Sequence, residues 1–427
     1  MTTVTRAPDR TAGERTQDKE KGFWALNWLR FVLAIYLVLF HTLKDNYDAI
    51  RDTWIQASLG LGNLATSVFF VLSGFLLMHA YVVVKGGRAV DKRKFWVARF
   101  STLYPLHIAT LLLGIIPVAH AILVRGEIKV PTEVQGAAVR ALGSGELVGG
   151  FFLNAALLSA WNPFYLLFNG PAWSLSALAC YYLIFPFIAL RIYEMKRPVA
   201  ALVFLGIAFA LPGAIADLLH LDDVVTAGIL HRNPVMRLPL FIAGMVLCVA
   251  FARARNAGSP FQFFIAAATT VATLILATEL QYLESEAHLI KNGLYYPASL
   301  AILWLCVCLK TNPGKGVQYW GARLGSASLP MFLLHVPLFP VFRAAEKFVK
   351  ALIHSPDWSM SAIIATGKQI DQGLECYWVY LVVLTVICVL VQERFVVPIQ
   401  GKIRNRMFAS SAAPVEAPKA SRAGPLH

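Results

Sequence analysis

Residues 29–42 read LRFVLAIYLVLFHT, an apolar stretch that predicts a membrane-spanning helix although it contains Arg30 and His41. An ionisable side chain within a span costs roughly 2.5–3.5 kcal/mol on insertion scales, so its presence needs a reason. Eleven residues at 100° each come within about 20° of three full turns, so both side chains are expected on one face, about 16 Å apart along the axis. Either they form a functional polar stripe, or Arg30 snorkels to the interface and His41 is a hydrogen-bonded core residue.

The composition of the whole chain supports a membrane protein. The 427 residues are 57% hydrophobic and 15% charged, and the mean hydropathy is +0.60. Soluble proteins are usually about 45–50% apolar and about 25% charged. The net charge of +14 would suggest nucleic acid as a partner of a soluble protein. In a membrane protein, basic residues gather in cytoplasmic loops, so we predict the lipid bilayer and no nucleic acid.

The apolar segments predict an all-α integral membrane protein with about ten transmembrane helices. The predicted spans are 23–43, 64–84, 101–123, 172–190, 198–216, 238–252, 261–280, 296–309, 328–346 and 374–393. If both ends of the chain lie in the cytoplasm, most of the 38 lysines and arginines fall on the inner side. This bias favours a multi-pass membrane protein with an N-in, C-in topology.

One further apolar segment, 149–168, does not fit this series of spans. It contains Asn154, Asn162 and Pro163, which interrupt it, and a full crossing would move the later basic loops to the outer side. We therefore expect a re-entrant or outer-surface element, whose irregular backbone lines a cavity or is buried in protein. Around the membrane domain, 23–400, we expect a polar cytoplasmic tail, 1–22, and a disordered cytoplasmic tail, 401–427, rich in Ala, Pro and Ser.

Four more motifs accompany the Arg30–His41 pair. Residues 69–75 read FFVLSGF, and Arg99 precedes the sequence LYP at the end of a strongly basic loop. Residues 173–176 read WSLS, and residues 324–337 read LGSASLPMFLLHVP, with His335 near the end. Each motif is weak by itself, but their number and order along the chain are specific.

Over residues 23–400 this set resembles the acyltransferase-3 family of integral membrane acyltransferases. The family has an Arg, ten residues and a His in its first span, matched by Arg30 and His41. The remaining matches are 69–75, Arg99, Trp173 to Ser176, and Leu324, Gly325, Ser328, His335 and Pro337. Two positions depart from the family pattern: Thr102 replaces a second Arg, and Leu178 replaces a Glu.

The resemblance implies an O-acyltransferase that moves an acyl group, commonly acetyl, from cytoplasmic acetyl-CoA or another acyl-CoA to a hydroxyl. The implied acceptor is a carbohydrate or glycolipid of the envelope or outside the membrane, and the implied location is a bacterial inner membrane. We expect His41 and Arg30 at the catalytic site, with His41 as a general base or as an acyl relay. Arginine binds phosphate in a bidentate manner, and we expect Arg99, Arg93 and Lys94 to bind the donor. We expect Trp173, Ser174, Ser176 and His335 to bind the acceptor, and we predict no metal.

A membrane transporter or channel without chemistry is the alternative, because charged intramembrane residues and a broken apolar segment also suit a solute path. A cation or proton path would more often carry Asp or Glu inside the spans, and the assigned spans place none of these deep in the membrane. A purely structural membrane protein explains the Arg30–His41 stripe poorly. The acceptor, the acyl chain and the oligomeric state stay open.

Overall fold

The computed structural model describes residues 23–131, 140–254, 256–283, 287–309, 311–370 and 373–409. Among these residues, nine helical segments are long and apolar enough to cross a membrane. They are built on α2 (Trp24–Thr42), α4 (Gly62–Met78) with η2 (His79–Val83), α5 (Lys92–Arg125), α7 (Trp173–Glu194), α8 (Pro198–Leu218), α10 (Pro234–Arg253), α11 (Pro260–Tyr282), α14 (Ser328–His354), and α16 (Tyr377–Val391) with η6 (Gln392–Val396) and α17 (Val397–Ala409). Each coincides with a predicted span, so the all-α, multi-span membrane fold is confirmed.

The remaining predicted span, 296–309, is also helical but is not among these nine. It forms α12 (Tyr295–Cys308), which spans about 21 Å. The preceding π-helical turn η5 (Ile290–Leu294) contains Lys291 and Asn292, and these polar residues shorten the apolar part of the helix.

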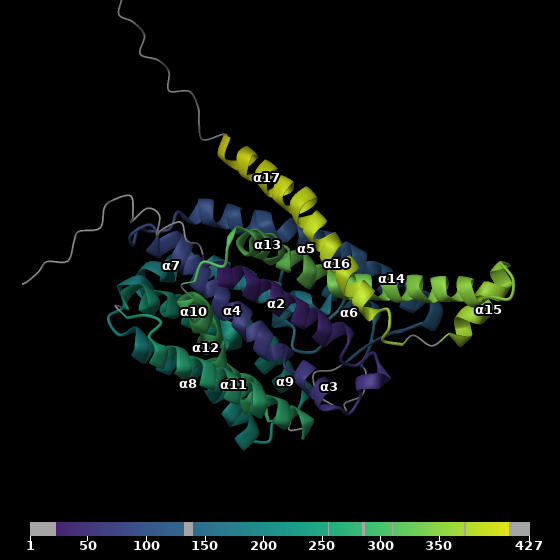
Figure 1. Cartoon of the computed structure of the whole chain (residues 1–427), viewed down its shortest axis with the longest axis horizontal. Helices are drawn as coiled ribbons and strands as arrows, with labels where there is room; N and C mark the ends of the chain where they lie inside the picture. The colour runs from purple at the N-terminus through teal and green to yellow at the C-terminus, as the bar shows by residue number, and fades with distance from the viewer. Residues whose placement is uncertain are drawn as a thin grey trace, which may run out of the picture.

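Shorter elements connect the spans. They are η1 (Asp48–Ile50), α3 (Trp54–Leu59), β1 (Ile128–Val130), β2 (Arg140–Leu142), α6 (Ser144–Ala155), η3 (Ser159–Trp161), η4 (Gly170–Ala172), α9 (Val224–Arg232), α13 (Lys315–Ser326) and α15 (Met360–Gln369). The two strands pair antiparallel, with Ile128 opposite Leu142. In Figure 1, α2, α4, α10 and α12 run side by side through the bundle, and α14 extends beyond it to α15.

Helices α4 and α10 pack backbone against backbone, and two glycines make this approach possible. A Cβ on Gly74 would overlap the carbonyl oxygen of Phe241, and a Cβ on Gly244 would overlap that of Val71. Small residues let membrane helices approach until their backbones touch. Gly74 of the FFVLSGF motif is therefore a packing residue that holds α4, and with it one wall of the site, against α10.

The interrupted segment 149–168 forms no spanning helix, as predicted. The 12 residues of α6 cover only about 18 Å, and an irregular chain follows. Side chains of α5 bind its end: the Tyr104 hydroxyl donates to the carbonyl oxygen of Ala155 (3.0 Å), and His107 Nε2 lies 2.8 Å from that of Asn154. These contacts satisfy the backbone polar groups that a broken helix leaves unpaired, which membrane surroundings require.

The first residues of the segment that we expected to form the C-terminal tail are helical. Residues 401–409 belong to α17, where Ile403 and Met407 face Val97 and Phe100 of α5, so packing against α5 orders them. The rest of the predicted tail, 410–427, and the predicted N-terminal tail, 1–22, lie outside the described residues.

Candidate active site

Two cavities open on the α2 face that contains Arg30 and His41. The first, called here the histidine cavity, has a volume of about 220 Å³ and is lined by His41, Asn63, Trp173, Asp222, His231 and His288, among others. The second, the arginine cavity, has a volume of about 360 Å³ and is lined by Arg30, Ser73, Arg99, Thr102, Tyr182 and Ser328, among others. The expected polar stripe of α2 thus ends in a different cavity at each end.

The two cavities share four lining residues, and we call this junction the neck. They are Leu37, Thr66, Ser174 and Phe332. Leu37 lies on α2 between Arg30 and His41, on the same face of the helix because it is seven residues after Arg30. Two of the four, Thr66 and Ser174, carry hydroxyl groups at the point where the cavities meet.

His41 is held by its own helix and by α14. Its Nδ1 lies 2.8 Å from the carbonyl oxygen of Leu37 and 3.1 Å from Nε2 of His335. A carbonyl oxygen only accepts hydrogen bonds, so Nδ1 carries the proton in the neutral ring, and Nε2 has a free lone pair. Because the Nδ1 edge is occupied, Nε2 is the atom of His41 that remains for a substrate in the histidine cavity.

The structure places His335 behind His41 rather than in a cavity wall. His335 is fully buried, and its Nδ1 lies 3.0 Å from the carbonyl oxygen of Met331. It lines neither the histidine cavity nor the arginine cavity. Its neighbour is therefore His41, and we do not include His335 among the acceptor contacts.

The arginine cavity has two guanidinium groups, Arg30 and Arg99. Nη2 of Arg99 donates to the Tyr81 hydroxyl at 3.0 Å, and the guanidinium lies 5.3 Å from the Tyr81 ring centre. Neither arginine forms an ion pair with a described residue, and no described Asp or Glu lines this cavity. Two positive charges without a carboxylate partner favour an anionic ligand.

The other two predicted donor residues lie outside the arginine cavity. Arg93 and Lys94 are exposed in the first turn of α5, and Lys94 Nζ is 3.7 Å from Asp91 Oδ2. By contrast, both positions that depart from the family pattern do line the cavity. Thr102 Oγ1 accepts a hydrogen bond from Gln400 Nε2 at 2.6 Å, and Leu178 adds an apolar surface.

The WSLS motif divides between the cavities and the broken segment. Trp173 lines the histidine cavity, with its ring centre 4.8 Å from that of His231, and Ser174 lines both cavities. Ser176 lines neither: its hydroxyl donates to the carbonyl oxygen of Leu157 (2.6 Å) and accepts from the amide of Ala160 (3.2 Å). Since both interactions fix the segment after α6, Ser176 has a structural role there.

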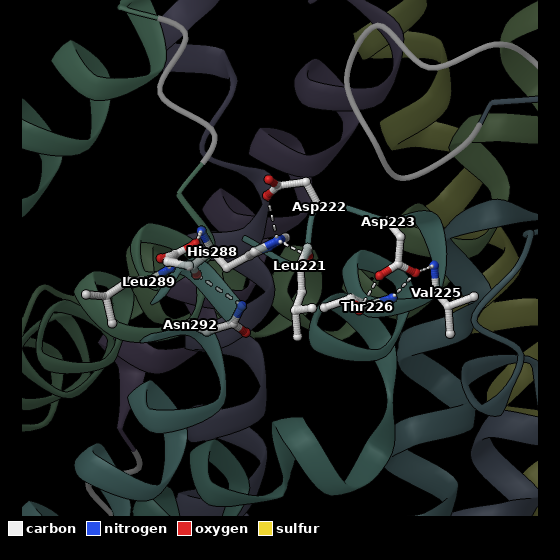
Figure 2. A network of polar contacts seen from close by, with 9 residues as sticks. Leu221, Asp222, Asp223, Val225, Thr226, His288, Leu289 and Asn292 are labelled. Carbon is white, nitrogen blue, oxygen red and sulfur yellow. Dashed lines mark hydrogen bonds and ion pairs between the residues drawn. The ribbon is translucent and has the colours of Figure 1, made fainter. Parts of the chain in front are cut away.

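Several polar residues of the histidine cavity were not predicted from the sequence. Figure 2 shows Asp222 pointing toward His288, whose Nε2 is 3.7 Å from Asp222 Oδ1 and 3.3 Å from the carbonyl oxygen of Leu221. Asp217 accepts hydrogen bonds from the amides of His288 and Leu289, which fixes the start of the helix that leads into η5. The sequence did contain a signal for these residues, because polar residues are concentrated in the two loops that follow the apolar spans 198–216 and 261–280.

The neighbouring Asp223 has a different task from Asp222. It caps α9 by accepting hydrogen bonds from the amides of Val225 and Thr226 and from the Thr226 hydroxyl (Figure 2). The hydrogen bond from the Thr226 hydroxyl and those from the amides hold the pKa of Asp223 below its usual range. Asp223 therefore stabilises the helix that presents His231 to the cavity.

These features define a multi-pass membrane protein with two adjoining cavities, one lined by His41 and the other by Arg30 and Arg99. The family model described as "Acyltransferase domain" matches residues 23–393, so the chain belongs to this acyltransferase family. It is 30% identical over 171 residues to "Acyltransferase MdmB" of Streptomyces mycarofaciens, a match that covers 38% of each chain. It is 31% identical over 166 residues to "Protein 2 in picA locus" of Rhizobium radiobacter, covering 38% of this chain and 78% of the relative. No solved structure matches.

Proposed function

We propose that this protein is a membrane O-acyltransferase that moves an acyl group, acetyl in the simplest case, from acyl-CoA to a carbohydrate hydroxyl. The observation that carries the proposal is the pair of cavities that meet at the neck, with Arg30 and Arg99 lining one cavity and His41 lining the other. A reaction between two substrates that arrive from opposite sides of a membrane needs this arrangement. The family assignment supports acyl transfer as the chemistry.

The donor occupies the arginine cavity in this proposal. CoA carries several phosphate charges, and Arg30 and Arg99 offer charge-assisted hydrogen bonds without a competing described carboxylate. The basic residues at the start of α5 agree with a cytoplasmic position of this end. The pantetheine arm then enters the cavity and brings the thioester to the neck.

The acceptor occupies the histidine cavity, where Trp173 and Ser174 lie beside polar groups of the outer loops. Because His41 lines this cavity and not the arginine cavity, it serves the acceptor rather than the donor. We therefore favour direct attack of the acceptor hydroxyl over an acyl-histidine intermediate. An aromatic ring beside hydroxyl, imidazole and carboxylate groups suits a carbohydrate.

The reaction at the neck has one bond formed and one broken. The acceptor hydroxyl gives its proton to His41 Nε2, and its oxygen attacks the thioester carbon. The C–S bond breaks, and the proton passes to the departing thiolate sulfur of CoA. The hydroxyls of Thr66 and Ser174 lie at the neck, where they donate to the carbonyl oxygens of Gly62 (3.0 Å) and Pro171 (3.2 Å). By turning from its carbonyl toward the thioester oxygen, either hydroxyl would stabilise the negative charge that develops there.

The test uses the purified chain in lipid nanodiscs with acetyl-CoA. The wild type should bind acetyl-CoA, release CoA thiol slowly to water, and release it faster with an acceptor glycan present. His41→Gln is the matched control, because it cannot take up the proton at this position. CoA release at the same rate by both proteins, or the absence of acetyl-CoA binding, would contradict the proposal and favour the solute-path alternative.

A further inference from the structure

The contact between His41 and His335 carries an inference that rests on the proposed function and goes beyond it. The two rings come from α2 and α14, and their centres are 5.0 Å apart. His41 Nδ1 and His335 Nε2 are separated by 3.1 Å, a hydrogen-bond distance between two side chains 294 residues apart in the sequence. In such a pair one nitrogen must donate and the other must accept.

The backbone decides which nitrogen donates. His335 Nδ1 faces the Met331 carbonyl oxygen at 3.0 Å, so in the neutral ring the proton is on Nδ1 and Nε2 is an acceptor. His41 Nδ1 faces the Leu37 carbonyl oxygen at 2.8 Å, so it carries a proton too. Both assignments are independent, and they agree: the His41 Nδ1–H is shared between the Leu37 oxygen and His335 Nε2.

We infer that His335 is a positioning residue that accepts the Nδ1–H of His41, so that the Nε2 lone pair of His41 faces the histidine cavity. When the acceptor hydroxyl gives its proton to Nε2, the His41 ring becomes a cation with N–H groups at both nitrogens. The lone pair of His335 then stabilises that cation during transfer. Asp plays this part for the histidine of serine proteases, and here a neutral imidazole stands in the same relation to the base.

The surroundings of His335 favour a positioning role over packing alone. The ring is fully buried, where a polar group without a partner would be costly, and both of its nitrogens have partners. The Tyr380 hydroxyl donates to the carbonyl oxygen of His335 at 2.7 Å and fixes the α14 backbone without using the ring. Backbone position and ring chemistry can therefore be tested separately.

The experiment compares three variants with acetyl-CoA as donor and water as acceptor, measured as release of CoA thiol. His335→Leu removes the acceptor atom, whereas His335→Gln keeps a side-chain oxygen that can accept the His41 Nδ1–H. Tyr380→Phe removes the backbone contact and leaves the ring intact. We expect His335→Leu to lower kcat about 10-fold or more. The upper limit is the roughly 10⁴-fold fall in kcat that follows when a serine protease loses the Asp that orients its catalytic histidine. The KM and the binding affinity for acetyl-CoA should stay within about two-fold of the wild type.

Rescue distinguishes the outcomes. The inference is supported if His335→Gln and Tyr380→Phe keep most of the wild-type kcat while His335→Leu loses it. The inference is overturned if all variants are equally active, or if His335→Gln loses as much activity as His335→Leu. It is also overturned if Tyr380→Phe loses as much activity as His335→Leu, or if His335→Leu loses affinity for acetyl-CoA. If the wild type itself neither binds nor cleaves acetyl-CoA, the proposed function fails, and that result is distinct from all of these.

Discussion

Arg30 and His41 lie on one face of α2 but open into different cavities, and Leu37 between them belongs to the wall of both. This apolar residue, seven positions after Arg30 and four before His41, separates the two ends of the proposed reaction. It keeps the charged donor groups on one side of the neck and the base on the other. A single helix can therefore set the spacing between the donor site and the base.

Replacement of His41 should abolish transfer and spare donor binding. Removal of a general base typically costs 10²–10⁴-fold in rate. His41→Gln keeps hydrogen-bonding capacity but cannot take up the proton, so it should be as inactive as His41→Ala. Equilibrium binding of radiolabelled acetyl-CoA and CoA release, measured on the same samples, check this. Near-normal CoA release by His41→Gln would make His41 a structural residue.

Replacement of Arg99 should weaken the binding of acyl-CoA. Charge-assisted hydrogen bonds contribute roughly 1.5–3 kcal/mol each, so Arg99→Ala should raise the Kd for acetyl-CoA by about ten-fold or more. Lys94→Ala is the matched control, because Lys94 is exposed near Asp91 in the same helix and lies outside the arginine cavity. Its Kd should change less than about two-fold. Equal effects of the two changes would make Arg99 a general charge of the basic loop.

The sequence was sufficient for the spans because each needs about 20 apolar residues, whatever surrounds it. It was less informative where helices continue past the apolar stretch. The structure begins α5 at Lys92 rather than at residue 101, and the last helical segment continues to Ala409. Contacts between α5 and α17 order these polar extensions, and hydropathy contains no signal for them.

The candidate site was predictable only in part for a related reason. The spacing of Arg30 and His41 within one helix fixes their common face, so a short stretch of sequence reveals it. The partner of His41 comes from α14, and no local pattern shows that the two helices touch at His335. Likewise, Ser174 and Ser176 look equivalent in the motif, but only the packing of η3 against α7 separates a cavity residue from a structural one.

The two serines of the WSLS motif should differ when each is changed to alanine. Ser176→Ala removes a donor and an acceptor from buried backbone groups, at a cost of about 1–3 kcal/mol, and should lower the Tm of the detergent-solubilised protein. Ser174→Ala removes one hydrogen bond, to the carbonyl oxygen of Pro171, and should lower the Tm less than Ser176→Ala does. It should lower the rate of transfer about ten-fold or more, because it removes a hydroxyl from the neck. Scanning fluorimetry and CoA release measure the two effects, and the reverse pattern would exchange the two roles.

Blocking the neck should separate donor binding from transfer. Leu37→Trp adds a large ring at the junction of the cavities, so the thioester can no longer reach the His41 side. Acetyl-CoA should still bind through Arg30 and Arg99, with a Kd within about three-fold of the wild type. CoA release should fall about 100-fold or more, because misplacing reacting groups by about 1 Å already costs this much in rate. Val32→Trp is the control, because Val32 is exposed on the same helix and a ring there faces away from the bundle. If Leu37→Trp transfers as fast as Val32→Trp, the donor reaches the acceptor by another route, and the neck is not the place of reaction.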